Sequence, residues 1–281
     1  MMNRLAIMGI GLMGGSLGLA ARRCGLARTV AGFARREAVR EAALEKGIVD
    51  EVHAAPGDAA ADADLVVFCL PVLAIPECAE VCRPHLKPGC VATDVGSTKR
   101  ELVFRMEQVL RDSGATFVGS HPIAGSDATG LEAACADLYD DAVVVVTPAA
   151  DPEALDVVEE FWGRLGSRVV RMHAEEHDRV IARTSHLPHL VAAALVDTVC
   201  REGGAFRRDL CGSGFRDTTR IAGGSESVWH DILRSNRDAV RAELGCFAEV
   251  LARVERMLDE DDFEGLRTFL GRCREWRSEF D

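Results

Sequence analysis

The sequence has no apolar run long enough to span a membrane and no excess of positive charge. Its 281 residues include 45 Asp and Glu against 33 Lys and Arg, which gives a formal net charge of −12. Nucleic acids and anionic membranes repel such a protein, so neither is expected as a partner. A membrane span needs roughly 18 consecutive apolar residues, and no apolar segment reaches that length. Because no cleavable apolar leader precedes the first predicted strand, we expect a cytoplasmic protein.

The sequence also lacks the signatures of a disulfide framework and of a metal site. Its 10 cysteines are scattered through apolar segments, and without a secretion signal we expect free thiols. Cys78 and Cys82 lie four residues apart with only His85 near them, which is not the spacing of a zinc site. His186 and His189 have a spacing that zinc ligands use, but neither a third ligand nor an HExxH motif accompanies them. We therefore predict no metal.

Strand and helix patterns alternate up to about residue 172, and strand patterns are absent beyond it. Continuous apolar runs such as residues 64–70 are typical of parallel strands buried on both faces. The alternation predicts a doubly wound, mostly parallel sheet with its ligand site at the carboxyl ends of the strands. We therefore predict a Rossmann-type α/β domain over residues 1–172. An all-helical domain is predicted over residues 173–281, with a kink at Pro188 and one helix over residues 228–258.

The start of the chain carries a dinucleotide-binding pattern. The apolar run Leu5–Met8 leads into Gly9-x-Gly11-x-x-Gly14, and a helix-forming segment follows. In this context the three glycines make the turn, admit a pyrophosphate and let strand and helix pack closely, while the helix N-terminus favours the anion. The cofactor-binding residues predicted here and at the following strand ends are Gly9, Gly11, Leu12, Met13, Gly14, Leu70, Pro71 and Ser97.

The end of the second predicted strand favours NADP over NAD. NAD-specific domains place an acidic residue there, about 20 residues beyond the glycines, to bind the ribose 2′-hydroxyl. This chain has Ala34, Arg35 and Arg36 instead. Guanidinium groups bind phosphate in a forked, charge-assisted geometry, and cations at a helix start are otherwise mildly disfavoured by the helix dipole. We predict these three residues as cofactor-binding, with NAD and solvated arginines as the alternative.

Two polar residues, Ser97 and His121, come directly after predicted strands. In such folds the nicotinamide lies at this carboxyl edge of the sheet. Ser97 lies in the segment Asp94–Lys99, where its hydroxyl either bridges cofactor and substrate or caps the next helix. His121 is predicted to lie in a tight loop after a strand. An imidazole there is placed to accept a hydroxyl proton while hydride leaves the same carbon, and a structural hydrogen bond is its alternative role. The segment Gly214–Arg220 supplies positive charge for an anionic substrate, or is a solvated basic loop.

Together these segments resemble the prephenate/arogenate dehydrogenase family of tyrosine biosynthesis. The match runs in order along essentially the whole chain. Its His-Pro-Ile-Ala-Gly and Gly-Phe-Arg-Asp-Thr-Thr-Arg segments are specific to that family rather than general to nucleotide-binding folds. The segments that carry the resemblance are Gly9–Ser16, Asp94–Lys99, Gly119–Gly125, Ser185–His189 and Gly214–Ala222.

The resemblance implies oxidative decarboxylation of prephenate to 4-hydroxyphenylpyruvate, with hydride transfer to NAD(P). It implies that His121 accepts the hydroxyl proton, that Ser97 orients it and that Arg220 holds a substrate carboxylate. It also implies a homodimer formed through the helical domain, with a Gly-rich loop that reaches the neighbour's pocket. It also assigns substrate-binding roles to His189, Trp229, Ser213 and Asp127. Asp178 and His186 match positions that hold the arginine and histidine in place.

Three alternatives remain open. Arogenate dehydrogenase, or a dual-specificity cyclohexadienyl dehydrogenase, differs only in its tolerance of a side-chain amino group, and His189 weakly favours prephenate. A β-hydroxyacid dehydrogenase shares the Gly-Leu-Met-Gly turn but needs a catalytic lysine in its second domain, and no lysine follows Lys99. A non-catalytic NADP-binding protein is the most distant alternative, because it does not need His121 and Arg220.

Overall fold

The computed structural model describes residues 1–124, 130–201 and 208–280. It divides into two compact units, Met1–Asn236 and Arg237–Asp281, which are described separately. No helix in the described part of the chain is both long and apolar enough to cross a membrane.

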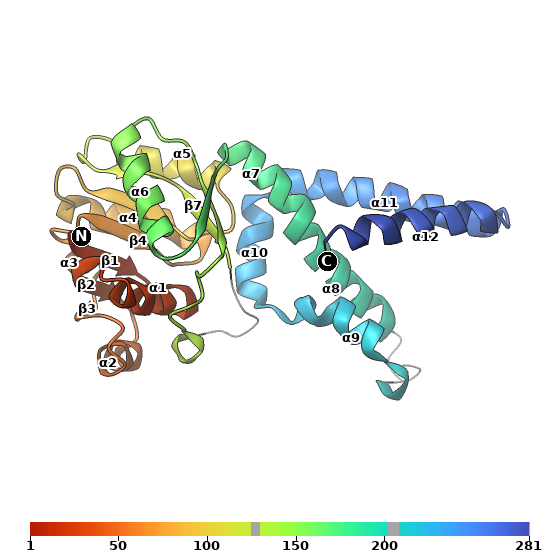
Figure 1. Ribbon diagram of the computed structural model, residues 1–281, viewed down its shortest axis with the longest axis horizontal. Helices are drawn as coiled ribbons and strands as arrows, with labels where there is room; N and C mark the ends of the chain where they lie inside the picture. The colour runs from red at the N-terminus through yellow and green to blue at the C-terminus, as the bar shows by residue number, and fades with distance from the viewer. Residues whose placement is uncertain (125–129, 202–207, 281) are drawn as a thin grey trace. The chain divides into compact units, whose positions relative to one another are not determined.

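The first unit is built on a six-stranded parallel sheet with the order β3-β2-β1-β4-β5-β6 (Figure 1). The central strand β1 is apolar and pairs on both edges, with Leu5 opposite Val30 on one side and Leu65 on the other. This order matches the doubly wound arrangement that the sequence predicts. The strands are β1 (Met2–Met8), β2 (Ala27–Phe33), β3 (Glu51–His53), β4 (Leu65–Phe68), β5 (Val91–Asp94) and β6 (Thr116–Phe117).

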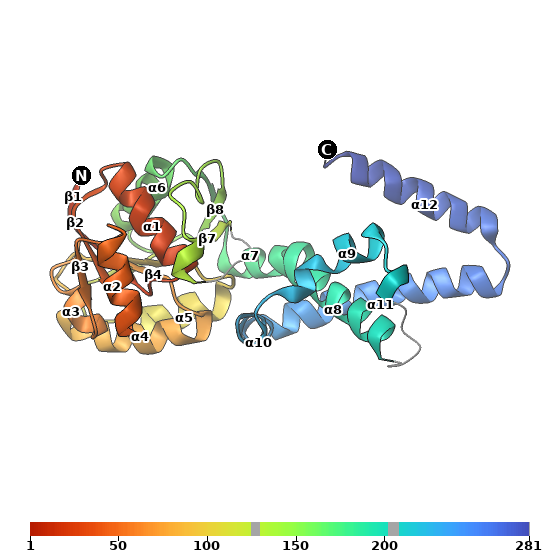
Figure 2. The ribbon, with the colours of Figure 1, turned by 90° about the horizontal axis from the view of Figure 1, so that it is seen from below.

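Helices cover both faces of the sheet, as Figure 2 shows. Alternate residues of β1 explain this layering, because Leu5 and Ile7 join one buried cluster while Ala6 and Met8 join the other. One face packs against α1 (Leu12–Arg23) and α6 (Pro152–Arg164), and the other against α3 (Pro56–Ala60), α4 (Ile75–Cys82) and α5 (Arg100–Val109). Helix α2 (Glu37–Glu45) follows β2.

Three further strands form a second, smaller sheet rather than extending the first. They are β7 (Ser120–Ile123), β8 (Val143–Val146) and β9 (Arg168–Arg171), with β7 antiparallel to β8. The prediction that His121 lies in a tight loop is therefore wrong, because it lies on β7 opposite Val145. The four consecutive valines of β8 pair with β7 on one edge and with β9 on the other.

Helices make up the rest of the first unit. Helix α7 (Ala174–Ile181) continues through a π-helical turn, Ala182–His186, into α8 (Leu187–Cys200). The sequence predicts a kink at Pro188; the structure places Pro188 in the first turn of α8, directly after the π-helical turn. The basic segment after residue 212 is helical rather than a loop, with α9 (Ser213–Thr219) followed by a 3-10 turn.

The single helix predicted over residues 228–258 is also wrong. Helix α10 (Glu226–Ser235) ends before Asn236, and α11 (Arg237–Asp259) begins after it. The Asn236 side chain donates to the backbone carbonyl of Asp178 at 2.7 Å, an interaction that a helical sequence pattern does not reveal. In the second unit, α11 precedes α12 (Phe263–Ser278), whose first turn is capped by Asp262.

Two helical glycines provide a matched test of the packing. A Cβ atom on Gly18 in α1 would lie 2.6 Å from the carbonyl oxygen of Ile48, whereas one on Gly163 in α6 meets nothing within 4 Å. We expect Gly18→Ala to lower the free energy of unfolding by about 1–3 kcal/mol, because α1 and the turn that carries Ile48 must move apart. Gly163→Ala should raise it by about 0.5 kcal/mol. Urea unfolding of both variants measures this, and equal effects would contradict the packing described.

Candidate active site

The turn between β1 and α1 has the shape of a pyrophosphate cradle. Gly9 has a φ of +104°, and a Cβ on Gly14 would lie 2.0 Å from the carbonyl oxygen of Gly9. Neither position therefore tolerates a side chain without movement. A Cβ atom on Gly11, in contrast, would meet no other atom within 4 Å, so there is open space beside this residue. Gly11 is also the N-cap of α1 and provides no side-chain cap, so the amides of the first turn remain available to an anion.

Positive charge gathers where β2 ends. Ala34 is buried, while Arg35 and Arg36 are exposed just before α2. Arg40 donates from Nη1 to the carbonyl oxygens of Ala34 (3.0 Å) and Arg35 (2.8 Å), which fixes the course of this turn. Arg40 was not among the predicted residues, although its spacing of four residues from Arg36, the N-cap of α2, places both on one face of that helix.

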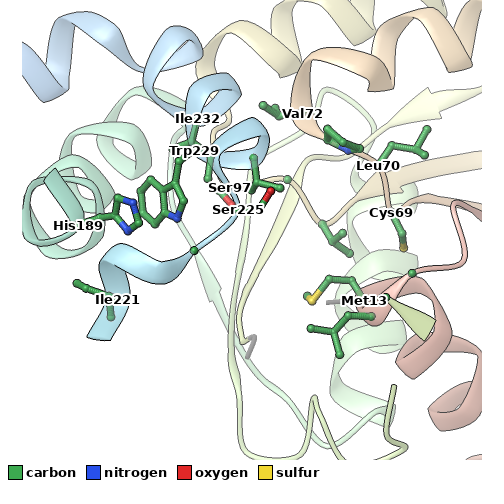
Figure 3. A pocket seen from close by; sticks show the side chains of 18 of the residues that line it. Met13, Cys69, Leu70, Val72, Ser97, His189, Ile221, Ser225, Trp229 and Ile232 are labelled. Carbon is green, nitrogen blue, oxygen red and sulfur yellow. The ribbon is translucent and has the colours of Figure 1, made fainter. Parts of the chain in front are cut away.

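A cavity of about 720 Å³ joins the glycine turn to the helices that follow residue 172 (Figure 3). Of the predicted cofactor residues, Gly11, Leu12, Met13, Leu70, Pro71 and Ser97 line it. Of the predicted substrate residues, His189, Arg220 and Trp229 line it. The predictions missed Gly224 and Ser225, which also form part of the wall.

Other predicted residues lie away from this wall. Gly9 and Gly14 form the turn beneath it, and Ala34, Arg35 and Arg36 lie at the end of β2. Ser213 is exposed at the start of α9. Asp127 lies outside the described residues.

Aromatic stacking shapes the end of the cavity formed by α8 and α10. The rings of His189 and Trp229 are stacked with centroids 3.5 Å apart, and the His186 ring meets the indole edge-on at 6.0 Å. A Cβ on Gly224 would lie 2.6 Å from Nε1 of Trp229, so only glycine leaves room for this stack. Burial lowers the pKa of His189, and it lowers the pKa of His186 to about 4, so both rings are neutral at pH 7.

A buried ion pair joins the loop that carries Ser97 to the strand that carries His121. Lys99 and Asp94 are fully buried and form a salt bridge. The second carboxylate oxygen of Asp94 accepts from the backbone amide of Ser120 at 3.0 Å. The Ser120 hydroxyl in turn donates to the carbonyl of Asp94 at 2.5 Å. Burial raises the pKa of the Asp94 carboxyl, and the Lys99 ammonium opposes that rise.

Behind His121 lies a chain of hydrogen bonds. Nδ1 of His121 is 2.8 Å from Nε2 of His177, and Nδ1 of His177 is 2.8 Å from Oδ1 of Asp178. His121 is only 9% exposed. Burial, followed by the charges of His177, Lys99 and His186, lowers the pKa of His121 well below its usual range, so the ring is neutral at pH 7. His177 was not among the predicted site residues, although it directly precedes Asp178.

Asp178 also holds the start of the helix that follows Ser97. Its carboxylate accepts from the backbone amides of Lys99 (2.7 Å) and Arg100 (2.9 Å), which is where α5 begins. Capping by Ser97, the alternative role for that hydroxyl, is not observed, since Lys99 is the N-cap and Asp178 accepts from the first amides. Burial acts to raise the pKa of Asp178, but the bonds from His177, Arg100 and Lys99 outweigh it and the pKa is lowered.

The cavity wall combines the Ser97 hydroxyl, Arg220 and the dinucleotide cradle. His121, Asp178 and His186 are not among the residues that line the cavity, and the loop of Ser97 is joined to the strand of His121 through Asp94. This arrangement is suited to removing a proton and a hydride from one alcohol carbon of an anionic substrate. In the described part of the structure, no three or more His, Cys, Asp or Glu side chains group closely enough to hold a metal ion.

Comparison with known proteins identifies the family of this chain. Residues 17–171 match the family described as "Prephenate dehydrogenase, nucleotide-binding domain", and residues 173–272 match "Prephenate dehydrogenase, dimerization domain". Cyclohexadienyl dehydrogenase of Zymomonas mobilis is 33% identical over 92% of this chain and 89% of its own length.

Two solved structures extend the similarity. Prephenate dehydrogenase from Aquifex aeolicus, in complex with hydroxyphenyl propionate and NAD+, is 32% identical. It superimposes with a TM-score of 0.93 over 100% of this chain and 99% of its own. Arogenate dehydrogenase from Synechocystis is 28% identical with a TM-score of 0.84, over 99% of this chain and 100% of its own. With its nucleotide-binding cradle, its cavity and both family domains, the chain belongs to the prephenate dehydrogenase family of oxidoreductases.

Proposed function

We propose that this protein oxidises prephenate, with loss of carbon dioxide, to 4-hydroxyphenylpyruvate. The observation that carries the proposal is the single cavity lined by the glycine turn, Ser97 and Arg220. The Aquifex relative, whose structure holds a hydroxyphenyl acid and NAD+, supports a ring of this size in such a cavity. Arogenate, whose side chain carries an amino group instead of a keto group, is the second candidate because one relative is an arogenate dehydrogenase.

In the proposed reaction, His121 takes the proton of the ring hydroxyl through its neutral imidazole. Ser97 lies at the cavity wall beside the cradle and orients that hydroxyl, while Arg220 binds a substrate carboxylate by charge-assisted hydrogen bonds. The bound nicotinamide accepts the hydride from the carbon that bears the hydroxyl. The bond from the ring to its carboxylate breaks, its electron pair completes the aromatic ring and carbon dioxide leaves. The chain's task is therefore positioning and proton acceptance.

We further propose NADP as the preferred cofactor. Arg35 and Arg36 are exposed where the 2′-position of the adenine ribose is bound in this fold, and Arg40 holds the turn that presents them. The domain boundary near residue 172 and a homodimer are also part of the proposal. The ranges matched by the two family domains support the boundary, and the description of the second one supports the dimer.

A two-by-two assay tests the proposed function. Prephenate and arogenate are each supplied with NAD and with NADP, and reduced cofactor is followed by its absorbance. We expect the highest kcat/KM for prephenate with NADP, together with release of carbon dioxide. A preference for arogenate of tenfold or more would overturn the substrate assignment, and no turnover of either compound would overturn the function.

Removing the proposed base tests the assignment of His121. His121→Asn should lower kcat by at least about 100-fold, because the side-chain amide cannot accept a proton. Cofactor affinity, measured by fluorescence titration, should change less than about threefold, since His121 lies outside the glycine cradle. Near-normal turnover would remove His121 from the mechanism.

A double substitution tests the cofactor assignment. Arg35→Ala with Arg36→Ala should weaken NADP binding by about tenfold or more and leave NAD binding nearly unchanged, because only NADP carries the 2′-phosphate. Calorimetric titration of each cofactor measures this. Arg28→Ala is the control, since that exposed arginine lies near the other end of β2. Equal losses for NAD and NADP would contradict a phosphate site.

A further inference from the structure

The hydrogen-bond chain behind His121 determines where its protons lie. Asp178 accepts two backbone amides as well as His177, and its pKa is lowered, so it is an ionised acceptor. A carboxylate cannot donate, so Nδ1 of His177 must donate the proton in the 2.8 Å contact with Asp178.

The proton position on His177 determines the proton position on His121. When the His177 ring carries a single proton, on Nδ1, its Nε2 has only a lone pair and accepts a hydrogen bond. Nδ1 of His121 is 2.8 Å from that atom and must therefore donate. Because burial keeps His121 neutral, its other nitrogen, Nε2, carries the lone pair.

We infer that His177 is a positioning residue that sets the tautomer of His121, so that Nε2 is the atom that accepts the substrate proton. This inference rests on the proposed function for its consequence in catalysis, but the tautomer itself does not depend on the substrate. Without an acceptor at Nδ1, the ring is free to carry its proton on Nε2, where it cannot act as a base. The hydrogen bond between His121 and His177 thus determines whether Nε2 of His121 can accept a proton.

Asp178 is the wrong residue with which to test this, because its loss would also leave the amides of Lys99 and Arg100 without their acceptor. The informative variants are His177→Phe, which removes both hydrogen bonds, and His177→Gln, which keeps an amide N–H for Asp178 and a carbonyl acceptor for His121. His230→Asn is the matched control. His230 also pairs through Nδ1 with the following aspartate, Asp231, at 3.0 Å, but its side chain is 65% exposed.

The direct readout is ¹⁵N NMR of histidine-labelled protein, with the His121 signals assigned by comparison with His121→Asn. In the wild type and in His177→Gln we expect His121 to carry its proton on Nδ1. In His177→Phe the tautomer protonated on Nε2 should appear. A wild-type His121 protonated on Nε2 would overturn the inference without any variant.

Kinetics provide the second readout. His177→Phe should lower kcat by about 100-fold or more with the KM for prephenate changed less than about threefold, whereas His177→Gln should retain at least about a tenth of kcat. His230→Asn should behave as the wild type. The inference fails if His177→Phe keeps normal turnover. It also fails if both His177 variants lose activity equally while the glutamine variant keeps the Nδ1 tautomer. If the wild type instead oxidises neither prephenate nor arogenate, the proposed function fails while the NMR result still decides the tautomer.

Discussion

The carboxylate of Asp178 is the interaction on which the rest of the site depends. One oxygen accepts from Lys99 at the start of α5 and from His177, and the other accepts from Arg100. Three donors on one buried anion offset its desolvation, and their loss would leave each of them without a partner in a dry interior. A side chain of α7 thereby fixes both the loop that carries Ser97 and the ring that supports His121.

The buried pair of Asp94 and Lys99 explains why these two parts hold together. A charge in this interior is tolerated only when it is paired and hydrogen-bonded, and Asp94 meets both conditions through Lys99 and the amides of Gly96 and Ser120. The pair is therefore better understood as a means of fixing geometry than as a source of stability, because hydrophobic residues of similar volume fill such a space at less cost. Through Asp94, the pair links the end of β5 to β7, and so connects the loop of Ser97 to the strand of His121.

Local patterns in the sequence were enough to predict the sheet, the glycine turn and the family, but not the way in which distant segments meet. The runs that form β1 and β4 are apolar throughout, so their burial on both faces follows from the residues alone. The place of His121 on β7 depends on the valines of β8, more than 20 residues later. Likewise, the helix break at Asn236 depends on the backbone of Asp178. Such long-range partners leave no periodic signal, and this is also why His177 was overlooked beside Asp178.

Burial of the imidazoles of His186 and His189 carries a cost in stability. Nδ1 of His189 and Nε2 of His186 are buried without hydrogen-bond partners in the described structure, and an unpaired buried nitrogen costs about 1–3 kcal/mol. Stacking of His189 on Trp229 offsets only part of this cost, since aromatic pairs contribute about 0.5–1.5 kcal/mol beyond the area that they bury. An apolar residue in place of either histidine would not bury an unpaired nitrogen and would avoid this cost. A contribution to folding stability therefore does not explain these buried histidines.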